Sequence, residues 1–311
     1  MIGLVGDRGG FRQAGGIRTL VQLLIRRLDV EGVRHRILAA THTAPAGCSA
    51  VLVLGCSSPW AYGLALKTLL RRPRIPVHWI PCFHPPRFVH HRYRARLALW
   101  ALRGLQKLGV QVHALTQAEH TELDNGRCSL LSLPFDCEET FVNAGATHQG
   151  SIVQRPYALA FLGRPVAQKG WPQYLSIVQQ LGEKCLALVP FKPTGACPEN
   201  LNIKIGLSDA DVCEQLRQCQ LLILPSDYES FGFAQAEALL SGCCIPVLGE
   251  WPLWLDIPEL DWRFLSTSQI AQEAHSLLTQ PATLKSLQTK PLQAWMRRPE
   301  RRAPRLPRLH G

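Results

Sequence analysis

The chain has 311 residues, of which 46% are hydrophobic and 18% are charged, so it is rich enough in apolar side chains to exclude a largely disordered protein. This length predicts about two domains. No apolar run approaches the roughly 20 residues of a membrane span, and MIGLVGDRGG lacks the basic region of a signal peptide, so we expect a first strand there.

The cysteines and the charges narrow the class of protein. None of the 11 cysteines forms a C-x-x-C pair, and several lie in apolar runs, so we expect reduced core residues of a cytoplasmic protein. The formal net charge is +11 and is unevenly placed. Residues 1–150 hold 18 Lys and Arg against 9 Asp and Glu, whereas residues 151–296 hold 10 against 13. The first half is therefore expected to meet an anionic surface or polymer.

In the first half, strand-like apolar runs alternate with helical ones. The predicted strands are residues 2–5, 36–40, 51–54, 77–83 and 110–115. The predicted helices are residues 17–28, 61–70, 87–107 and 118–123. Alternation at this spacing predicts a parallel, doubly wound sheet, so residues 1–150 are expected to form a Rossmann-like domain.

A glycine-rich loop joins the first strand to the first helix and ends in Gly15 and Gly16. Glycines let a backbone approach phosphate, and the helix that follows favours an anion. A plain tight turn is the alternative. The spacing does not fit G-x-G-x-x-G, and no acid ends the second strand to hold a ribose, so an NAD-dependent enzyme is disfavoured.

The run VHWIPCFHPP places His84 at the end of a predicted strand, where it can position a ligand, although a structural or surface histidine is an equally good interpretation. The helix of residues 87–107 follows. Arg92, Arg96, Arg103 and Lys107 share one arc of that helix. Its second arc holds apolar residues, namely Tyr93, Leu97, Ala101, Leu105 and Leu108. A basic amphipathic helix in acid-free surroundings suggests contact with anionic lipid or with a lipid-linked acceptor, and a solvated face is the alternative.

The second half restarts the alternation after a polar linker at residues 143–154. Its predicted strands are residues 157–162, 186–189, 203–205, 221–224 and 243–249. Its predicted helices are residues 171–181 and 209–218, a helix that opens at Phe231 and closes on Gly242, and residues 268–278. Residues 151–290 are expected to form a second Rossmann-like domain, and the basic, proline-broken tail 291–311 is expected to be disordered.

Two glutamates flank the start of the helix after the strand at 221–224. Glu229 lies in the loop and Glu237 lies a turn or so into the helix. Ligands of open α/β sheets bind outside the carboxyl ends of the strands, and a helix N-terminus favours an anion. Carboxylates beside that anion suit vicinal hydroxyls, because an ionised carboxylate only accepts hydrogen bonds. Phosphate and hydroxyls together point to a nucleotide sugar.

Two cations follow the first strand of the second half. In FLGRPVAQKG, Arg164 and Lys169 lie between that strand and the next helix, so both are expected to reach a ligand at the strand's carboxyl end. Fixed cations stabilise a departing diphosphate, which gains charge as it leaves. Asp209 and Asp211 form a D-x-D pair, but Ser208 before them is a good N-cap and acids complement a helix N-terminus, so we assign no metal.

The run from Glu229 through F-G-F to Glu237, followed by G-x-x-P-V, resembles the E-x7-E signature of family 4 of the retaining GT-B glycosyltransferases. The run from Gly163 to Gly170 is similar to the family's G-R-x4-K-G element, and Gly15-Gly16 is similar to its donor-binding glycine loop. Weaker similarities are the turn Gly206-Leu207 to a base-binding turn, His84 to a strand-end histidine near the reacting sugar, TQAEHTEL to a late helix of the first domain, and LPFD to an element before the interdomain crossing. The chain is shorter than most members.

This resemblance implies a GT-B fold, with two Rossmann-like domains facing across a cleft. It implies transfer of a sugar from a nucleotide diphosphate donor to a glycan or lipid-linked acceptor, with retention and without metal or cofactor. Glu237 would hold the ribose and Glu229 the donor sugar, while Arg164, Lys169 and the helix start at Phe231, Gly232 and Phe233 would hold the diphosphate. In the front-face mechanism proposed for the family, the leaving phosphate takes the acceptor proton.

Two alternatives remain from the sequence. A non-catalytic scaffold or membrane-associated subunit on the same fold would fail to hydrolyse a panel of donors. A nucleic-acid-binding protein is suggested only by the charge, since no aromatic residues interleave a basic strand face, and we expect no specific nucleic-acid partner. We expect a cytoplasmic enzyme, with the inner membrane face as a further place of association.

Overall fold

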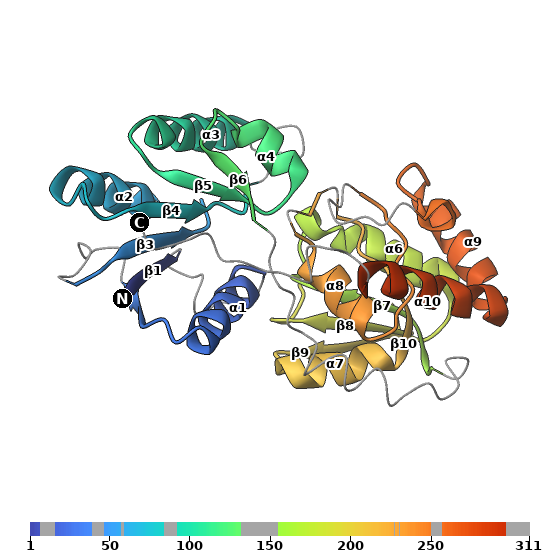
Figure 1. Cartoon of the computed structure of the whole chain (residues 1–311). Helices are drawn as coiled ribbons and strands as arrows, with labels where there is room; N and C mark the ends of the chain where they lie inside the picture. Colours follow the sequence, from blue (N-terminus) through green and yellow to red (C-terminus); the bar gives the residue numbers. More distant parts are fainter. Residues whose placement is uncertain are drawn as a thin grey trace. The chain divides into compact units, whose positions relative to one another are not determined.

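The computed structural model describes residues 1–6, 16–38, 47–56, 59–83, 92–131, 155–226, 228–229, 231–249 and 257–296. These residues fall into two compact units, of which the first reaches residue 131 and the second starts at residue 155 (Figure 1). The predicted linker and the predicted boundary at residues 150 and 151 lie outside the described residues, so both stay predictions.

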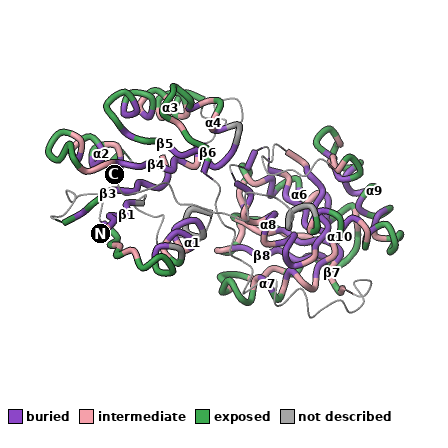
Figure 2. Tube along the Cα trace, in the orientation of Figure 1, coloured by how far each residue is buried: buried purple, intermediate pink, exposed green. Residues whose placement is uncertain are grey.

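The first unit is built on a parallel sheet with the strand order β2-β1-β3-β4-β5-β6. Its strands are β1 (Ile2–Gly6), β2 (His35–Leu38), β3 (Ala50–Leu54), β4 (Val77–Ile80), β5 (Gln111–Ala114) and β6 (Cys128–Leu130). β3 and β4 are buried along their whole length (Figure 2), as expected where elements cover both faces of a parallel sheet. The order reverses between β1 and β3, which makes that place the switch point of the sheet.

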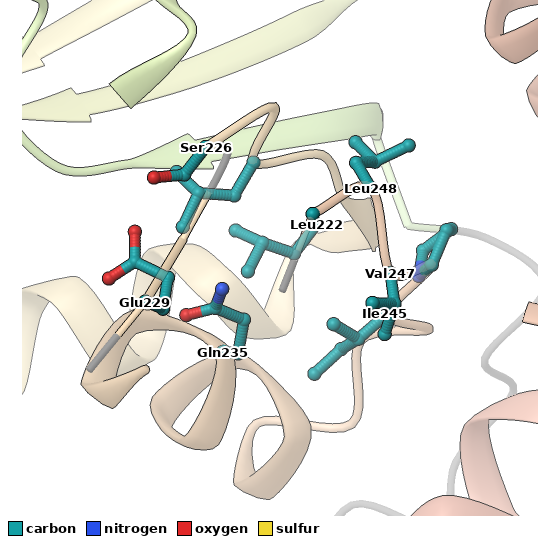
Figure 3. Close-up of a pocket in the computed structure, with 10 residues that line it drawn as sticks. Leu222, Ser226, Glu229, Gln235, Ile245, Val247 and Leu248 are labelled. Carbon is teal, nitrogen blue, oxygen red and sulfur yellow. The ribbon is translucent and has the colours of Figure 1, made fainter. Parts of the chain in front are cut away.

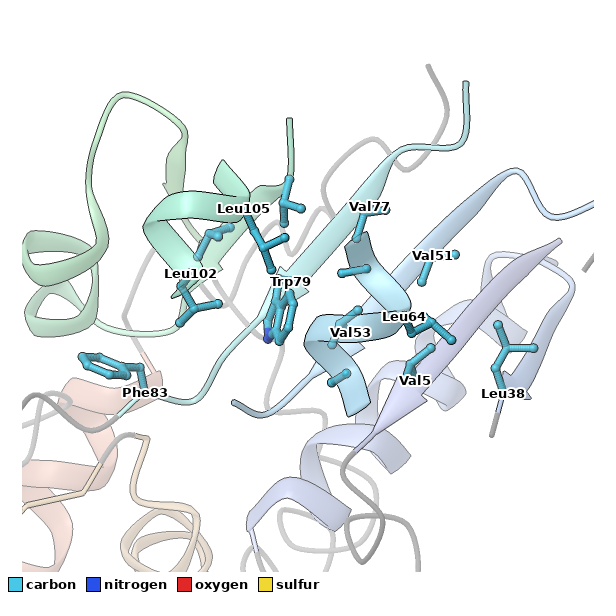
Figure 4. Packing of buried hydrophobic residues seen from close by; sticks show 14 of the residues in the cluster. Val5, Leu38, Val51, Val53, Leu64, Val77, Trp79, Phe83, Leu102 and Leu105 are labelled. Atoms are coloured by element: carbon cyan, nitrogen blue, oxygen red, sulfur yellow. The ribbon is translucent and has the colours of Figure 1, made fainter. Parts of the chain in front are cut away.

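Four helices of the first unit are described. They are α1 (Gly16–Val30), α2 (Pro59–Arg71), α3 (Arg92–Lys107) and α4 (Gln117–Leu123). α2 and α3 pack on one face of the sheet, where Val53, Trp79 and Leu102 belong to one buried cluster (Figure 4). α1 lies on the other side of the sheet (Figure 1). None of the helices in the described part of the chain is long and apolar enough to cross a membrane.

Two features of the first sheet differ from the prediction. β4 ends at Ile80 and not at residue 83, because Pro81 has no N–H to donate and Cys82 has a φ of 48°. The short edge strand β6 was not predicted; its three residues are half-buried or exposed, so no alternation of apolar residues marks it.

The second unit has a parallel sheet with the order β10-β7-β8-β9. Its strands are β7 (Tyr157–Leu162), β8 (Cys185–Val189), β9 (Leu201–Ile205) and β10 (Cys219–Leu222). The chain runs from β7 outward through β8 and β9 and then returns to the other side of β7 as β10. The switch point therefore lies between the carboxyl ends of β7 and β10, where open α/β sheets bind ligands.

The predicted strand at residues 243–249 is wrong as a strand. Cys244 forms one parallel bridge to Leu221 beside β10, supported by 2.9 Å hydrogen bonds from the Leu222 N–H to the Cys244 carbonyl and from the Cys244 N–H to the Gln220 carbonyl. Pro246 follows, and because proline cannot donate to the ladder, the pairing with β10 stops after that bridge, while Val247 forms a separate parallel bridge to Asp261.

The helices of the second unit follow the prediction more closely. They are α6 (Trp171–Leu181), α7 (Asp209–Arg217), α8 (Phe233–Leu240), α9 (Thr267–Leu278) and α10 (Pro281–Met296), with short 3-10 turns η4 (Ala167–Lys169) and η5 (Pro258–Leu260). α10 was not predicted. The expectation of a disordered tail from residue 291 is wrong for residues 291–296, because they belong to this helix. Leu284, Leu287, Gln288 and Pro291 form one buried stripe, whose burial offsets the hydrogen bond that the proline removes. Residues 297–311 lie outside the described residues.

Candidate active site

The loops that follow β7 and β10 meet at the switch point of the second sheet. Gly170, at the end of η4, has a φ of 70°, and a Cβ placed on it would lie 2.1 Å from the Pro225 carbonyl oxygen. Only glycine allows this approach of the two backbones. The Ser226 hydroxyl reaches across to the Gln168 carbonyl at 3.4 Å and so links the same two loops.

This approach brings two of the predicted site residues into direct contact. The Lys169 Nζ donates to Glu229 Oε1 at 2.5 Å, and the two side chains are only 20% and 10% exposed. A charged pair this far from water requires good geometry to offset its desolvation, and removal of one partner leaves an uncompensated charge. The ion pair therefore fixes the Glu229 carboxylate at the carboxyl edge of the sheet.

α8 begins beside this ion pair, and no side chain in the described part of the loop caps it. Its N-cap residue is Gly232, which has a φ of 77°, and no acid lies in the first turn. The rings of Phe231 and Phe233 contact each other on either side of the glycine, with centroids 4.4 Å apart. A helix start without a capping side chain keeps N–H groups and a partial positive charge available for an anion.

A small hollow lies next to Glu229 (Figure 3). Its polar lining consists of Ser226, Glu229 and Gln235, and its apolar lining comes from the end of β10 and from residues 245–248. The space inside is enough for about one water molecule. Ser226 and Gln235 were not among the predicted site residues, because their sequence neighbours give no sign that either lies at a site.

Glu237 lies on another side of α8. It is two residues from Gln235, which corresponds to about 200° around a helix. It is also close enough to Asp209 of α7 for that charge to affect its pKa. Burial raises the pKa of the Glu237 carboxyl to about 8, and the Asp209 charge adds to the rise. A raised pKa favours the protonated carboxyl, which can donate a hydrogen bond as well as accept one.

The remaining predicted residues of the second unit lie along the same edge. Arg164 is exposed two residues after β7 and takes no part in the ion pair between Lys169 and Glu229. Gly206, with a φ of 65°, and Leu207 form the turn between β9 and α7. The capping interpretation of the D-x-D pair is confirmed, since the Ser208 hydroxyl accepts from the Asp211 N–H at 3.2 Å.

The predicted residues of the first unit are mostly outside the described residues. Gly15 and His84 are both outside, and Gly16 is the first residue of α1. Glu119 of the TQAEHTEL run is fully buried, and one of its carboxylate oxygens accepts from the Leu115 N–H at 2.8 Å. Burial raises the pKa of Glu119 to about 8.

No family model matches the chain. A curated relative, the 2-deoxystreptamine N-acetyl-D-glucosaminyltransferase of Niallia circulans, is 26% identical over 155 residues. That match covers 41% of this chain and 37% of the relative, so the chain spans well under half the length of that protein.

Solved structures resemble the chain along nearly its whole length. The sucrose-phosphate synthase of Thermosynechococcus elongatus has a TM-score of 0.73 and is 14% identical, with 95% of this chain and 94% of that chain covered. WaaG, a glycosyltransferase involved in lipopolysaccharide biosynthesis, has a TM-score of 0.65 and is 12% identical, with 98% and 97% covered. The predicted fold class is therefore confirmed, and the chain has the GT-B fold of these glycosyltransferases.

Proposed function

We propose that this protein is a glycosyltransferase that moves a sugar from a nucleotide diphosphate donor to a glycan or lipid-linked acceptor, with retention of configuration and without a metal. The observation that carries the proposal is the shielded ion pair between Lys169 and Glu229 at the switch point between β7 and β10. A pair held there, beside the uncapped start of α8, gives a cation, a carboxylate and an anion-binding helix end within one small region.

Each group has a role in the proposed reaction. The C1–O bond of the donor sugar breaks, and the diphosphate leaves with the electron pair. Lys169, the exposed Arg164 and the start of α8 stabilise the charge that grows on it. Glu229 accepts hydrogen bonds from the sugar, Glu237 holds the ribose, and the turn at Gly206 and Leu207 lies against the base. The acceptor oxygen forms the new bond on the same face, and its proton passes to the leaving phosphate.

The relatives support this reading of the site. The curated relative is named as an N-acetyl-D-glucosaminyltransferase, and WaaG as a glycosyltransferase. Both names denote sugar transfer, which is also the activity proposed here from the site. The alternative is a non-catalytic scaffold or membrane-associated subunit on the same fold. A close ion pair that is held away from water, with the hollow beside it, favours the enzyme.

A donor screen tests the proposal. The purified protein is heated with UDP, GDP and ADP sugars, and one of them is expected to raise the melting temperature, since a ligand at 100 times its Kd adds about 2.7 kcal/mol of stability. Donor hydrolysis with and without EDTA then tests turnover and metal dependence, and NMR of the product anomer tests retention. If no donor shifts the melting temperature and none is hydrolysed, the protein is not this enzyme.

A second proposal concerns α3 and the membrane. The apolar arc of this helix is divided, because Leu105 is buried in the core whereas Tyr93 is 79% exposed and Leu97 and Leu108 are also exposed. The helix packs on the first unit through Leu102 and Leu105. Trp100, 75% exposed, joins the outward apolar residues. Exposed aromatic residues among Arg92, Arg94 and Arg96 suit the interface of an anionic bilayer, which would place the protein at the inner membrane face.

Vesicle co-sedimentation tests this second proposal. Binding to vesicles in which about one lipid in three is phosphatidylglycerol is expected to exceed binding to vesicles of pure phosphatidylcholine. It is expected to fall in the double variant Leu97→Ser with Trp100→Ser. Val30→Ser on α1 is the control, since Val30 is also an exposed apolar residue but belongs to another helix. Binding that ignores the anionic lipid, or that the control abolishes as well, would refute a role for α3.

A further inference from the structure

The hollow beside Glu229 contains a polar side chain that the proposed reaction does not use. Gln235, in the first turn of α8, is 6% exposed and lines the hollow together with Glu229 and Ser226. Figure 3 shows its amide next to the Glu229 carboxylate. The Gln235 Oε1 is buried and has no hydrogen-bond partner within the part of the chain that the structure describes.

An unpaired amide oxygen at this position is costly and is not required for packing. A buried acceptor without a partner costs about 1–3 kcal/mol. The other lining residues include Leu222, Ile245 and Val247, so an aliphatic side chain would suit the same surroundings. Gln288 on α10 is also buried with an unpaired Oε1, but its Nε2 donates to the Gln220 carbonyl at 3.1 Å and so has a structural partner.

The chemistry of the hollow limits what can complete it. An amide oxygen needs a hydrogen-bond donor, which a phosphate oxygen cannot supply and a hydroxyl can. The hollow has space for about one water molecule, so a group of hydroxyl size can enter it and a whole sugar ring cannot. Glu229, beside it, is a second acceptor. Two neighbouring acceptors match two neighbouring hydroxyls.

We infer that Gln235 is a specificity-determining residue that accepts a hydrogen bond from a hydroxyl of the transferred sugar, next to the hydroxyl that Glu229 binds. This inference rests on the proposed function. A site that is built to pair with a hydroxyl discriminates against an analogue without it, because the buried partner is then left unpaired. Gln235 would thus contribute to the choice of sugar and not to the binding of the diphosphate.

The test compares Gln235→Met with Gln288→Met. Calorimetric titration gives the Kd of each variant for the nucleotide sugar found in the donor screen and for the matching free nucleoside diphosphate. Gln235→Met is expected to raise the Kd for the nucleotide sugar about tenfold and to leave the Kd for the free nucleoside diphosphate within about twofold of the wild-type value. Gln288→Met is expected to leave both within about twofold. If Gln235→Met does not fold, Gln235→Leu takes its place.

Monodeoxy donors provide a second readout that a structural role would not change. Removal of one particular hydroxyl from the donor is expected to lower its affinity for the wild type about tenfold. The same removal is expected to leave its affinity for Gln235→Met unchanged. The inference is overturned if Gln235→Met weakens sugar and free diphosphate equally, if it weakens neither, or if every deoxy donor loses the same affinity in both proteins. A wild type that binds no nucleotide sugar refutes the proposed function itself, whereas a wild type that binds one while Gln235→Met matches it refutes only the role of Gln235.

Discussion

Two helices of the second unit, α7 and α8, each follow a parallel strand and yet begin in opposite ways. α7 closes its own start, because the Ser208 side chain accepts from the Asp211 N–H, and Asp209 and Asp211 place negative charge in the first turn. α8 starts at a glycine with no capping side chain and no acid in its first turn. The start of α7 is capped by a side chain of its own loop, whereas no side chain among the described residues caps the start of α8.

The same contrast extends to the side chains around each helix start. Beside α8, Lys169 and Glu229 are held together away from water, and the Gln235 oxygen has no hydrogen-bond partner among the described residues. Beside α7, the Ser208 hydroxyl also donates to Asp211 Oδ2 at 2.6 Å, so its polar groups are paired with each other. A site is expected where local groups remain unsatisfied at the switch point of a sheet, and on this criterion α8 marks it.

The largest effect is expected from Lys169→Ala, which removes the cation beside the uncapped start of α8. Turnover of the donor should fall by about 10²-fold or more, as for other lost donors to a transition state. The change also leaves the Glu229 carboxylate unpaired, so the double variant with Glu229→Gln should recover stability without recovering turnover. Lys184→Ala, at an exposed lysine before β8, is the control. Turnover near the wild-type rate in Lys169→Ala would remove this ion pair from the mechanism.

Gly232→Asp gives α8 the acidic, capped start that α7 has. Aspartate tolerates a φ of 77° better than most residues, and its carboxylate would cap the helix and repel a diphosphate. Affinity for the nucleoside diphosphate should fall at least tenfold in a calorimetric titration, or about 1.4 kcal/mol. Gly232→Asn caps without the charge and should lose less. Equal losses in the two variants would mean that backbone strain, and not the open helix start, governs binding.

The sequence predicted the closed parts of the second unit well because their signals are local. α6 has the predicted bounds, since Pro172 near its start and Gly182 after its end mark both termini. Lys169 and Glu229 could be predicted from motifs at fixed spacing. Their direct contact could not, because it depends on Gly170 meeting Pro225 across 55 residues of sequence.

Gln235 and α10 show where local signals stop. In the run FAQAEALL, a glutamine is an ordinary helix residue, and it becomes significant only because β10 and residues 245–248 enclose it. Pro291 suggested the end of structure, yet the buried stripe of Leu284, Leu287 and Gln288 continues the helix to Met296. In both cases packing against distant segments outweighed the local pattern.

The two helices are coupled through Glu237, which gives a prediction on pH. The folded protein raises the pKa of Glu237 from 4.5 to about 8, so the stability from this group is complete below about pH 4.5 and is lost as the pH rises through 8. Glu237→Gln cannot ionise. Its gain in unfolding free energy over the wild type should therefore grow as the pH rises from 5 to 8 and level off above pH 8, which urea denaturation at each pH measures.

Two controls accompany the pH series. Glu119, whose pKa burial also raises to about 8, is present in both proteins, so its contribution cancels in the difference. Asp209→Asn removes the charge that adds to the rise and should make the pH dependence of the wild type shallower. A difference between Glu237→Gln and the wild type that stays constant from pH 5 to pH 9 would show that Glu237 is ionised throughout.

The smallest effect is expected from Ser208→Ala, which opens the closed helix. Loss of the cap should lower the free energy of unfolding by about 1 kcal/mol, measured by urea denaturation. Affinity for the donor should stay within about twofold, because the Ser208 hydroxyl is already engaged by Asp211. Ser266→Ala removes the similar cap of α9 and should cost about the same stability. A tenfold loss of donor affinity in Ser208→Ala but not in Ser266→Ala would mean that the start of α7 also contributes to ligand binding. The difference proposed between the capped start of α7 and the uncapped start of α8 would then be wrong.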